Sequence, residues 1–209
     1  MTLLGSILEW LAWWGYCFVV AGAIAVLLVR NQETRLKVLR VLLVLGGVLV
    51  GSIFLAAAYG KMKPFPGFAW GWASLKISIT YFAMQVSSYE ILSPTASNFV
   101  AHVLPFFELF LGLWLVSGIG RRYSSALASL VFFGFMLAIT YAWLRGLKIN
   151  CGCGIGPPEE AGPQALLRDG KRFFLPSILL AIGTFYSYRK RTVALASAAV
   201  PSASPAHAD

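Results

Sequence analysis

The chain has 209 residues, of which 58% are hydrophobic and only 12% are charged. Soluble domains carry about a quarter charged residues, so the composition excludes an ordinary water-soluble fold and predicts that lipid surrounds most of the chain. The net charge of +9 does not indicate nucleic-acid binding, because the basic residues lie in short clusters between apolar runs. That distribution is typical of topology signals and of contacts with lipid headgroups.

The apolar runs predict an all-α fold, a polytopic bundle of transmembrane helices. About 20 residues of helix cross a hydrocarbon core of roughly 30 Å, and backbone groups in lipid must hydrogen-bond within their own helix. Residues 5–29 form the first run, which has no basic n-region and no clear cleavage site, so we interpret it as a retained anchor rather than a signal peptide. Further full spans are expected over residues 38–60, 98–118, 123–144 and 173–188.

Residues 74–93 are the ambiguous segment. They are long enough to span a membrane, but they carry Lys76, Gln85 and Glu90 together with several hydroxyl side chains. We therefore predict a helix that lies in the membrane interface or is half-inserted. The bundle then has five full spans, and a sixth span over this segment is the alternative.

We expect one transmembrane domain over residues 1–191. Within it, residues 1–37 form an extra anchor helix and residues 45–185 form the core. Residues 192–209 are mostly Ala, Ser and Pro and are predicted to be a disordered tail.

Cys151 and Cys153 lie in a Gly- and Pro-rich polar loop predicted over residues 145–172. With the amino terminus outside and five spans, the short inner connectors include the arginine pair at residues 121–122 and the basic triplet at residues 189–191. The positive-inside rule favours this orientation, and six spans would leave both clusters inside as well. Both topologies place the cysteine pair outside, which in a bacterial inner membrane means the periplasm, where disulfides form and persist.

The Cys-x-Cys spacing predicts redox chemistry. Two thiols separated by one glycine can cycle between dithiol and disulfide, and Gly152 has no Cβ to crowd so small a ring. Arg145 lies close in sequence, and a nearby cation favours the thiolate, which is the attacking species. Exchange with another protein would pass through a mixed disulfide. We expect Cys151 to attack and Cys153 to resolve, and the reverse order stays open.

Other interpretations of the cysteines are weaker. The pair could simply line a loop. A zinc site needs about four ligands, and the chain offers only His102 and His207 as imidazoles, so we expect no metal site within this chain alone. Cys17 lies deep in the first apolar run and is interpreted as a packing residue.

Glu108 lies near the middle of the span at residues 98–118. A carboxylate there costs about 2.5 kcal/mol or more and is a functional hypothesis by default. It is either protonated or paired with Lys61, which ends the preceding span, and its role is either a helix-to-helix lock or a redox or proton-relay group. His102 is expected to point away from Glu108, near the outer interface, where it could contact a quinone headgroup or simply pack.

Three short motifs follow one another along the chain. They are Gly51-Ser52-Ile53-Phe54-Leu55-Ala56 leading to Gly60-Lys61, Leu104-Pro105 with Glu108-Leu109, and Arg145-Gly146 followed by Cys151-Gly152-Cys153. In this order, over roughly residues 45–185, they resemble the MauE/DoxX family of redox-associated membrane proteins, in particular its methylamine utilisation MauE branch. The chain departs from the family's Cys-Gly-Cys-Phe-Gly segment, because Gly154-Ile155-Gly156 follows the pair.

The resemblance implies a thiol–disulfide oxidoreductase, or quinone-linked redox work, that supports maturation of periplasmic redox proteins beside a thioredoxin-like partner. The sequence shows no nucleotide, flavin or haem motif, so the electrons would come from a quinone or a partner protein. The main alternative is a structural or accessory subunit of a larger respiratory or photosynthetic membrane complex. A transporter built around Glu108 is disfavoured, because the sequence has no internal repeat.

Overall fold

The computed structural model describes residues 32–64, 69–147, 149 and 162–199. Every regular element within these ranges is helical: α2 (Gln32–Met62), α3 (Trp72–Ser87), α4 (Pro94–Ser117), α5 (Arg121–Leu144), α6 (Pro163–Asp169), the π-helical turn η1 (Gly170–Phe174) and α7 (Leu175–Ala199). The all-α prediction is therefore confirmed for the described part of the chain.

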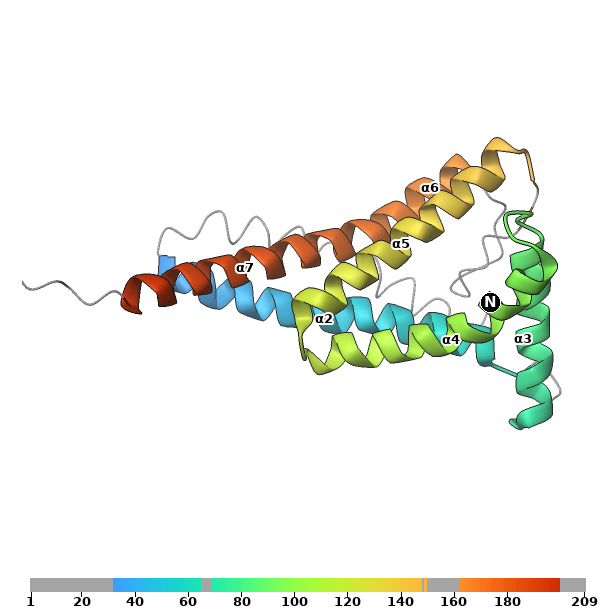
Figure 1. Ribbon diagram of the computed structural model, residues 1–209, viewed down its shortest axis with the longest axis horizontal. Helices are drawn as coiled ribbons and strands as arrows, with labels where there is room; N and C mark the ends of the chain where they lie inside the picture. Colours follow the sequence, from blue (N-terminus) through green and yellow to red (C-terminus); the bar gives the residue numbers. More distant parts are fainter. Residues whose placement is uncertain (1–31, 65–68, 148, 150–161, 200–209) are drawn as a thin grey trace, which may run out of the picture.

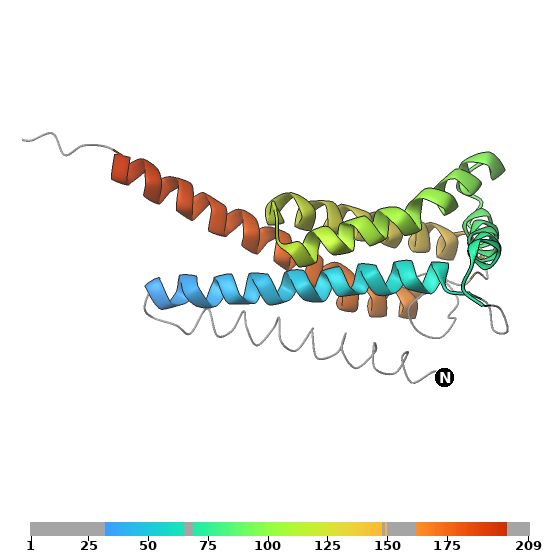
Figure 2. The same ribbon diagram turned by 90° about the horizontal axis from the view of Figure 1, so that it is seen from below.

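Four long helices run along the molecule and α3 crosses one end of it (Figures 1 and 2). Helix α2 packs against α4 and α7, and α5 packs against α7. The carboxyl ends of α2 and α5 and the amino ends of α4 and α6 lie at the end that α3 crosses, which we call the α3 end (Figure 1). The turn between α4 and α5 and the carboxyl end of α7 lie toward the opposite end.

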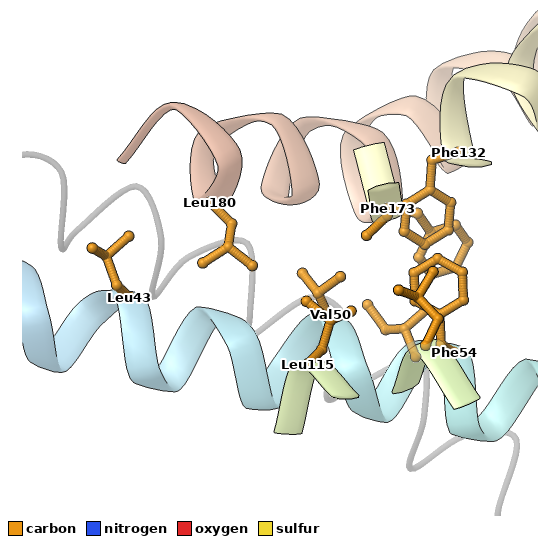
Figure 3. Packing of buried hydrophobic residues seen from close by; sticks show 10 residues of the cluster. Leu43, Val50, Phe54, Leu115, Phe132, Phe173 and Leu180 are labelled. Atoms are coloured by element: carbon orange, nitrogen blue, oxygen red, sulfur yellow. The ribbon is translucent and has the colours of Figure 1, made fainter. Parts of the chain in front are cut away.

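The core lies where α2, α4, α5 and η1 meet. Phe54 and Phe132 have ring centroids 4.7 Å apart, and Phe132 stacks on Phe173 at 5.9 Å. Figure 3 shows these rings beside Val50 and Leu115, with the core continuing along α2 to Leu43. Because η1 supplies Phe173, this short turn is part of the packed interior rather than of a loop.

Glycines allow α2 to approach α4 closely. A Cβ added to Gly51 would lie 2.8 Å from the Gly112 carbonyl oxygen, and a Cβ added to Gly112 would lie 2.9 Å from that of Gly51. Real Cβ atoms do not come this close, so the crossing requires glycine on both helices. Small residues at helix contacts are typical of membrane bundles.

Three described helices are long and apolar enough to cross a membrane: Glu33–Met62, Pro94–Ser117 and Arg121–Leu144. They correspond to the spans expected at residues 38–60, 98–118 and 123–144. The first expected span, residues 5–29, lies outside the described residues. The last, residues 173–188, is divided between η1 and α7, and the basic triplet at residues 189–191 leaves α7 too short an apolar stretch. The structure thus supports a helical membrane protein, but not the count of five full spans.

Two segment predictions need correction. The loop expected over residues 145–172 ends early, because α6 begins at Pro163 and continues into η1. Proline is favoured in the first turn of a helix, and Ala165, Leu166 and Leu167 are good helix formers. The tail expected to be disordered from residue 192 is helical as far as Ala199, since an alanine-rich stretch continues a helix readily.

Candidate functional site

A buried ion pair joins α2 to α4. The Lys61 ammonium lies 2.8 Å from both carboxylate oxygens of Glu108. The two side chains are only 3% and 1% exposed. Of the two states considered for Glu108 from the sequence, the structure shows the ion-paired one.

The helix directions explain why these two side chains meet. Lys61 lies in the last turn of α2, and Glu108 lies in the interior of α4. Side chains on a helix lean toward its amino terminus. Because α2 and α4 run in opposite directions (Figure 1), Lys61 leans back into the bundle while Glu108 leans toward the α3 end, and their charged groups converge.

Aromatic rings enclose the Lys61 ammonium. It lies 5.4 Å from the centroid of the Phe82 ring on α3 and 5.9 Å from that of Phe135 on α5. Such cation–π contacts favour a desolvated ammonium. Removing either partner of a buried ion pair leaves an uncompensated charge, which typically costs about 3–5 kcal/mol. The ion pair and its aromatic contacts thus come from four helices, α2, α3, α4 and α5.

The ion pair opens onto a cavity of about 30 Å³. Apolar side chains form most of its wall, and a second carboxylate, that of Asp169, also lines it. Asp169 is 1% exposed and accepts a hydrogen bond of 2.9 Å from the Nε of Arg168. Asp169 was missed by the sequence reasoning, which assigned it to a polar loop. The available signal was that it is the only acidic residue between Glu160 and Asp209.

A larger groove lies between α3, α4 and α5, with a volume of about 640 Å³. Its lining is mostly apolar, with Gln85, Tyr89, Thr140 and Tyr141 as the polar contributors. Sites for small molecules usually have about 300–1,000 Å³ and a mostly apolar wall. Phe82 and Phe135 both line the groove and both lie against the Lys61 ammonium, so aromatic rings lie between the buried charges and the groove.

Arg145 lies at the edge of this groove. Its guanidinium forms an ion pair of 3.2 Å with Glu90 and donates a hydrogen bond of 3.1 Å to the hydroxyl of Tyr141, a groove residue. Both charged side chains are about half exposed, so the pair contributes little to stability. Arg145 directly follows α5 and precedes the cysteine segment in the sequence.

The other predicted site residues lie elsewhere or outside the described part. His102 is exposed on α4, with its Nδ1 2.8 Å from the Asn98 carbonyl oxygen, and it lines neither the cavity nor the groove. Cys151 and Cys153 lie outside the described residues, as does Cys17. The cysteine segment connects α5 to α6 in the sequence, and the carboxyl end of α5 and the amino end of α6 lie toward the α3 end (Figure 1).

Long apolar helices with an ion pair buried among them define a helical membrane protein. Its family follows from the sequence: the model for "Methylamine utilisation protein MauE" matches residues 39–189, which is well over half of the chain, so the chain belongs to this family. The match confirms the MauE part of the resemblance seen in the motifs, and the wider DoxX grouping stays a prediction. Searches of curated proteins and of solved structures gave no match.

Proposed function

We propose that this protein is a membrane thiol–disulfide oxidoreductase whose Cys151/Cys153 pair exchanges electrons with a thioredoxin-like periplasmic protein or a quinone. Oxidation of the two thiols to a disulfide releases two electrons and two protons. A partner disulfide takes them up to become a dithiol, through a mixed disulfide, or a quinone takes them up to become a quinol. The work served is the maturation of periplasmic redox proteins.

The observation that carries the proposal is the position of the groove. Tyr141 and Leu144 line it, and they end the helix that leads into the cysteine segment. Arg145, next along the chain, is held at the groove edge by Glu90. A quinone in the groove would therefore lie near the carboxyl end of α5, the helix that precedes the cysteine segment in the sequence. The groove's apolar wall suits an isoprenoid tail, and Tyr141 and Gln85 suit a carbonyl-bearing ring.

The proposed topology is a bacterial inner-membrane protein with five full spans, with the cysteine segment in the periplasm and α3 in the outer interface. Basic residues support this orientation. Arg40, Arg121, Arg122, Arg189 and Lys190 belong to the parts of α2, α5 and α7 remote from the α3 end (Figure 1). An inner face rich in Arg and Lys is what the positive-inside rule requires.

Single replacements Cys151→Ser and Cys153→Ser test the redox proposal, with Cys17→Ser as the matched control. Removing the resolving thiol should trap a partner as a mixed disulfide on a non-reducing gel, whereas removing the attacking thiol should trap none. The control should behave as the wild type. If the double Cys151→Ser, Cys153→Ser variant still supports full maturation of a periplasmic disulfide protein, the thiol proposal is wrong and an accessory role in a membrane complex becomes the better account.

A further inference from the structure

Two carboxylates and one ammonium line the same buried cavity. Glu108 and Lys61 form the ion pair, and Asp169 enters the cavity wall from α6, with Arg168 bound to it. Among the described side chains that line the cavity, the others are apolar: residues 53, 54, 57, 132, 135, 136 and 173. These four charged groups balance one another in sign, two positive and two negative.

This arrangement differs from a simple lock between helices. In an isolated ion pair, neutralising the carboxylate leaves the buried ammonium unopposed, which is costly. Here Asp169 keeps a negative charge on the wall of the same cavity, so Glu108 can take up a proton without leaving Lys61 alone with apolar side chains. The cavity of about 30 Å³ is also large enough for water, which needs about 10–15 Å³ of such volume.

The donor geometry of Lys61 points the same way. An ammonium has three N–H donors, and the partners of Lys61 among the described residues are the two oxygens of Glu108 and the rings of Phe82 and Phe135. The hydrogen bonds therefore engage only one side of the ammonium. A water molecule in the cavity would accept a hydrogen bond from the Lys61 ammonium and donate one to a carboxylate.

The backbone at Asp169 is unusual as well. The residue ends α6, and the next five residues form the π-helical turn η1. Such turns insert a residue into the helical repeat and frequently occur at functional sites. Asp169 is buried, whereas the Arg168 side chain bound to it is 19% exposed, so the pair connects the cavity to the surface on the α6 side.

We propose that Lys61, Glu108 and Asp169 form a buried proton-exchange site, whose ligand is a proton carried by water and whose access lies along Arg168 and Asp169. On loading, the Glu108 carboxylate becomes a carboxyl group, Lys61 remains an ammonium, and Asp169 remains the carboxylate that shares the cavity with it, so the four groups together carry one added positive charge. On unloading, the proton returns through cavity water to the α6 side. This site does not depend on the chemistry of the cysteine pair.

Infrared difference spectroscopy of the full-length protein in nanodiscs tests the site. Acidification of the wild type, labelled with ¹³C-carboxyl glutamate, should reversibly produce the carbonyl stretch of a buried protonated carboxyl while circular dichroism shows intact helices. Transfer to D₂O should shift that band. The band should be lost in Glu108→Gln and kept in Glu33→Gln, a control in which an exposed carboxylate on the same membrane bundle is removed.

Asp169→Asn tests the access route. It should slow the deuterium shift of the Glu108 band, and Glu33→Gln should leave the shift rate unchanged. Two wild-type results would overturn the proposal without any variant having to fold: no buried carboxyl band before the helices unfold, or a band that fails to shift in D₂O. An unchanged band in Glu108→Gln would also overturn it. Thiol trapping by the cysteine variants is measured separately, so either proposal can fail alone.

Discussion

Gly51 on α2 and Gly112 on α4 face each other so closely that a Cβ on either residue would lie under 3 Å from the other's carbonyl oxygen. This crossing brings the two helices into contact between the ion pair on one side and the α4–α5 turn on the other. It also fixes how far apart the backbones of α2 and α4 lie, and therefore whether Lys61 can reach Glu108.

Replacing Gly51 by valine should destabilise the bundle, because the added atoms have no space at the crossing. Overpacking typically costs about 1–3 kcal/mol. Gly134→Ala is the matched control: its Cβ would meet no atom within 4 Å, and alanine favours a helix over glycine by about 1 kcal/mol. Unfolding titrations with SDS in mixed micelles compare the two variants. Equal midpoints for Gly51→Val and Gly134→Ala would contradict the close crossing.

Glu108→Gln should destabilise the protein by at most about 3–5 kcal/mol, the cost of removing one partner of a buried ion pair, because the Lys61 ammonium loses the carboxylate hydrogen-bonded to it and retains only Asp169 as a carboxylate on the same cavity wall. The double variant Lys61→Met, Glu108→Leu should recover much of this loss, since it removes both charges. Glu33→Gln breaks an exposed pair with Lys37 and should change stability by less than about 1 kcal/mol. The same SDS titration measures all three. A double variant less stable than Glu108→Gln would show that the pair is needed for more than charge balance.

Filling the groove should abolish quinone binding. Ala138 lines the groove on α5, and Ala138→Trp would place a large ring inside it. Leu130→Trp on the same helix adds the same side chain at a position that is 64% exposed and lines neither the groove nor the cavity beside Lys61. Quenching of tryptophan fluorescence by a short-chain quinone, measured against a variant-specific baseline in nanodiscs, reports binding. Comparable affinity in both variants would place the quinone somewhere else.

The cysteine pair should react with reagents that cannot cross the membrane. In intact cells, an impermeant alkylating mass tag should label Cys151 and Cys153 only after mild reduction, because the proposed pair faces an oxidising compartment as a disulfide. Cys17→Ser removes the remaining thiol and leaves the pattern unambiguous. Labelling without reduction would indicate free thiols, and failure to label even in reduced cells would argue against an outward-facing pair.

Much of the architecture was already fixed by hydropathy. The three described helices long and apolar enough to cross a membrane are apolar runs bounded by charges or by glycine turns, and lipid leaves the backbone of such runs little alternative to a helix. The family could also be recognised from short motifs, because Gly60-Lys61, Leu104-Pro105 with Glu108, and the Arg145-Gly146 segment occur in a fixed order. The pairing of Lys61 with Glu108 was one of two states that the cost of a buried charge left open.

The sequence alone could not predict which side chains from distant parts of the chain lie together in the site. The sequence predicts Asp169 in a loop. In the structure, Asp169 ends α6 and lines the cavity beside Glu108, which lies some sixty positions earlier in the chain. The wall formed by Phe135 and the groove behind it depend on how α3 and α5 pack, which no local pattern encodes. Composition and periodicity determine where single helices form, because those effects are local; only the packing of helices decides which distant side chains share a cavity.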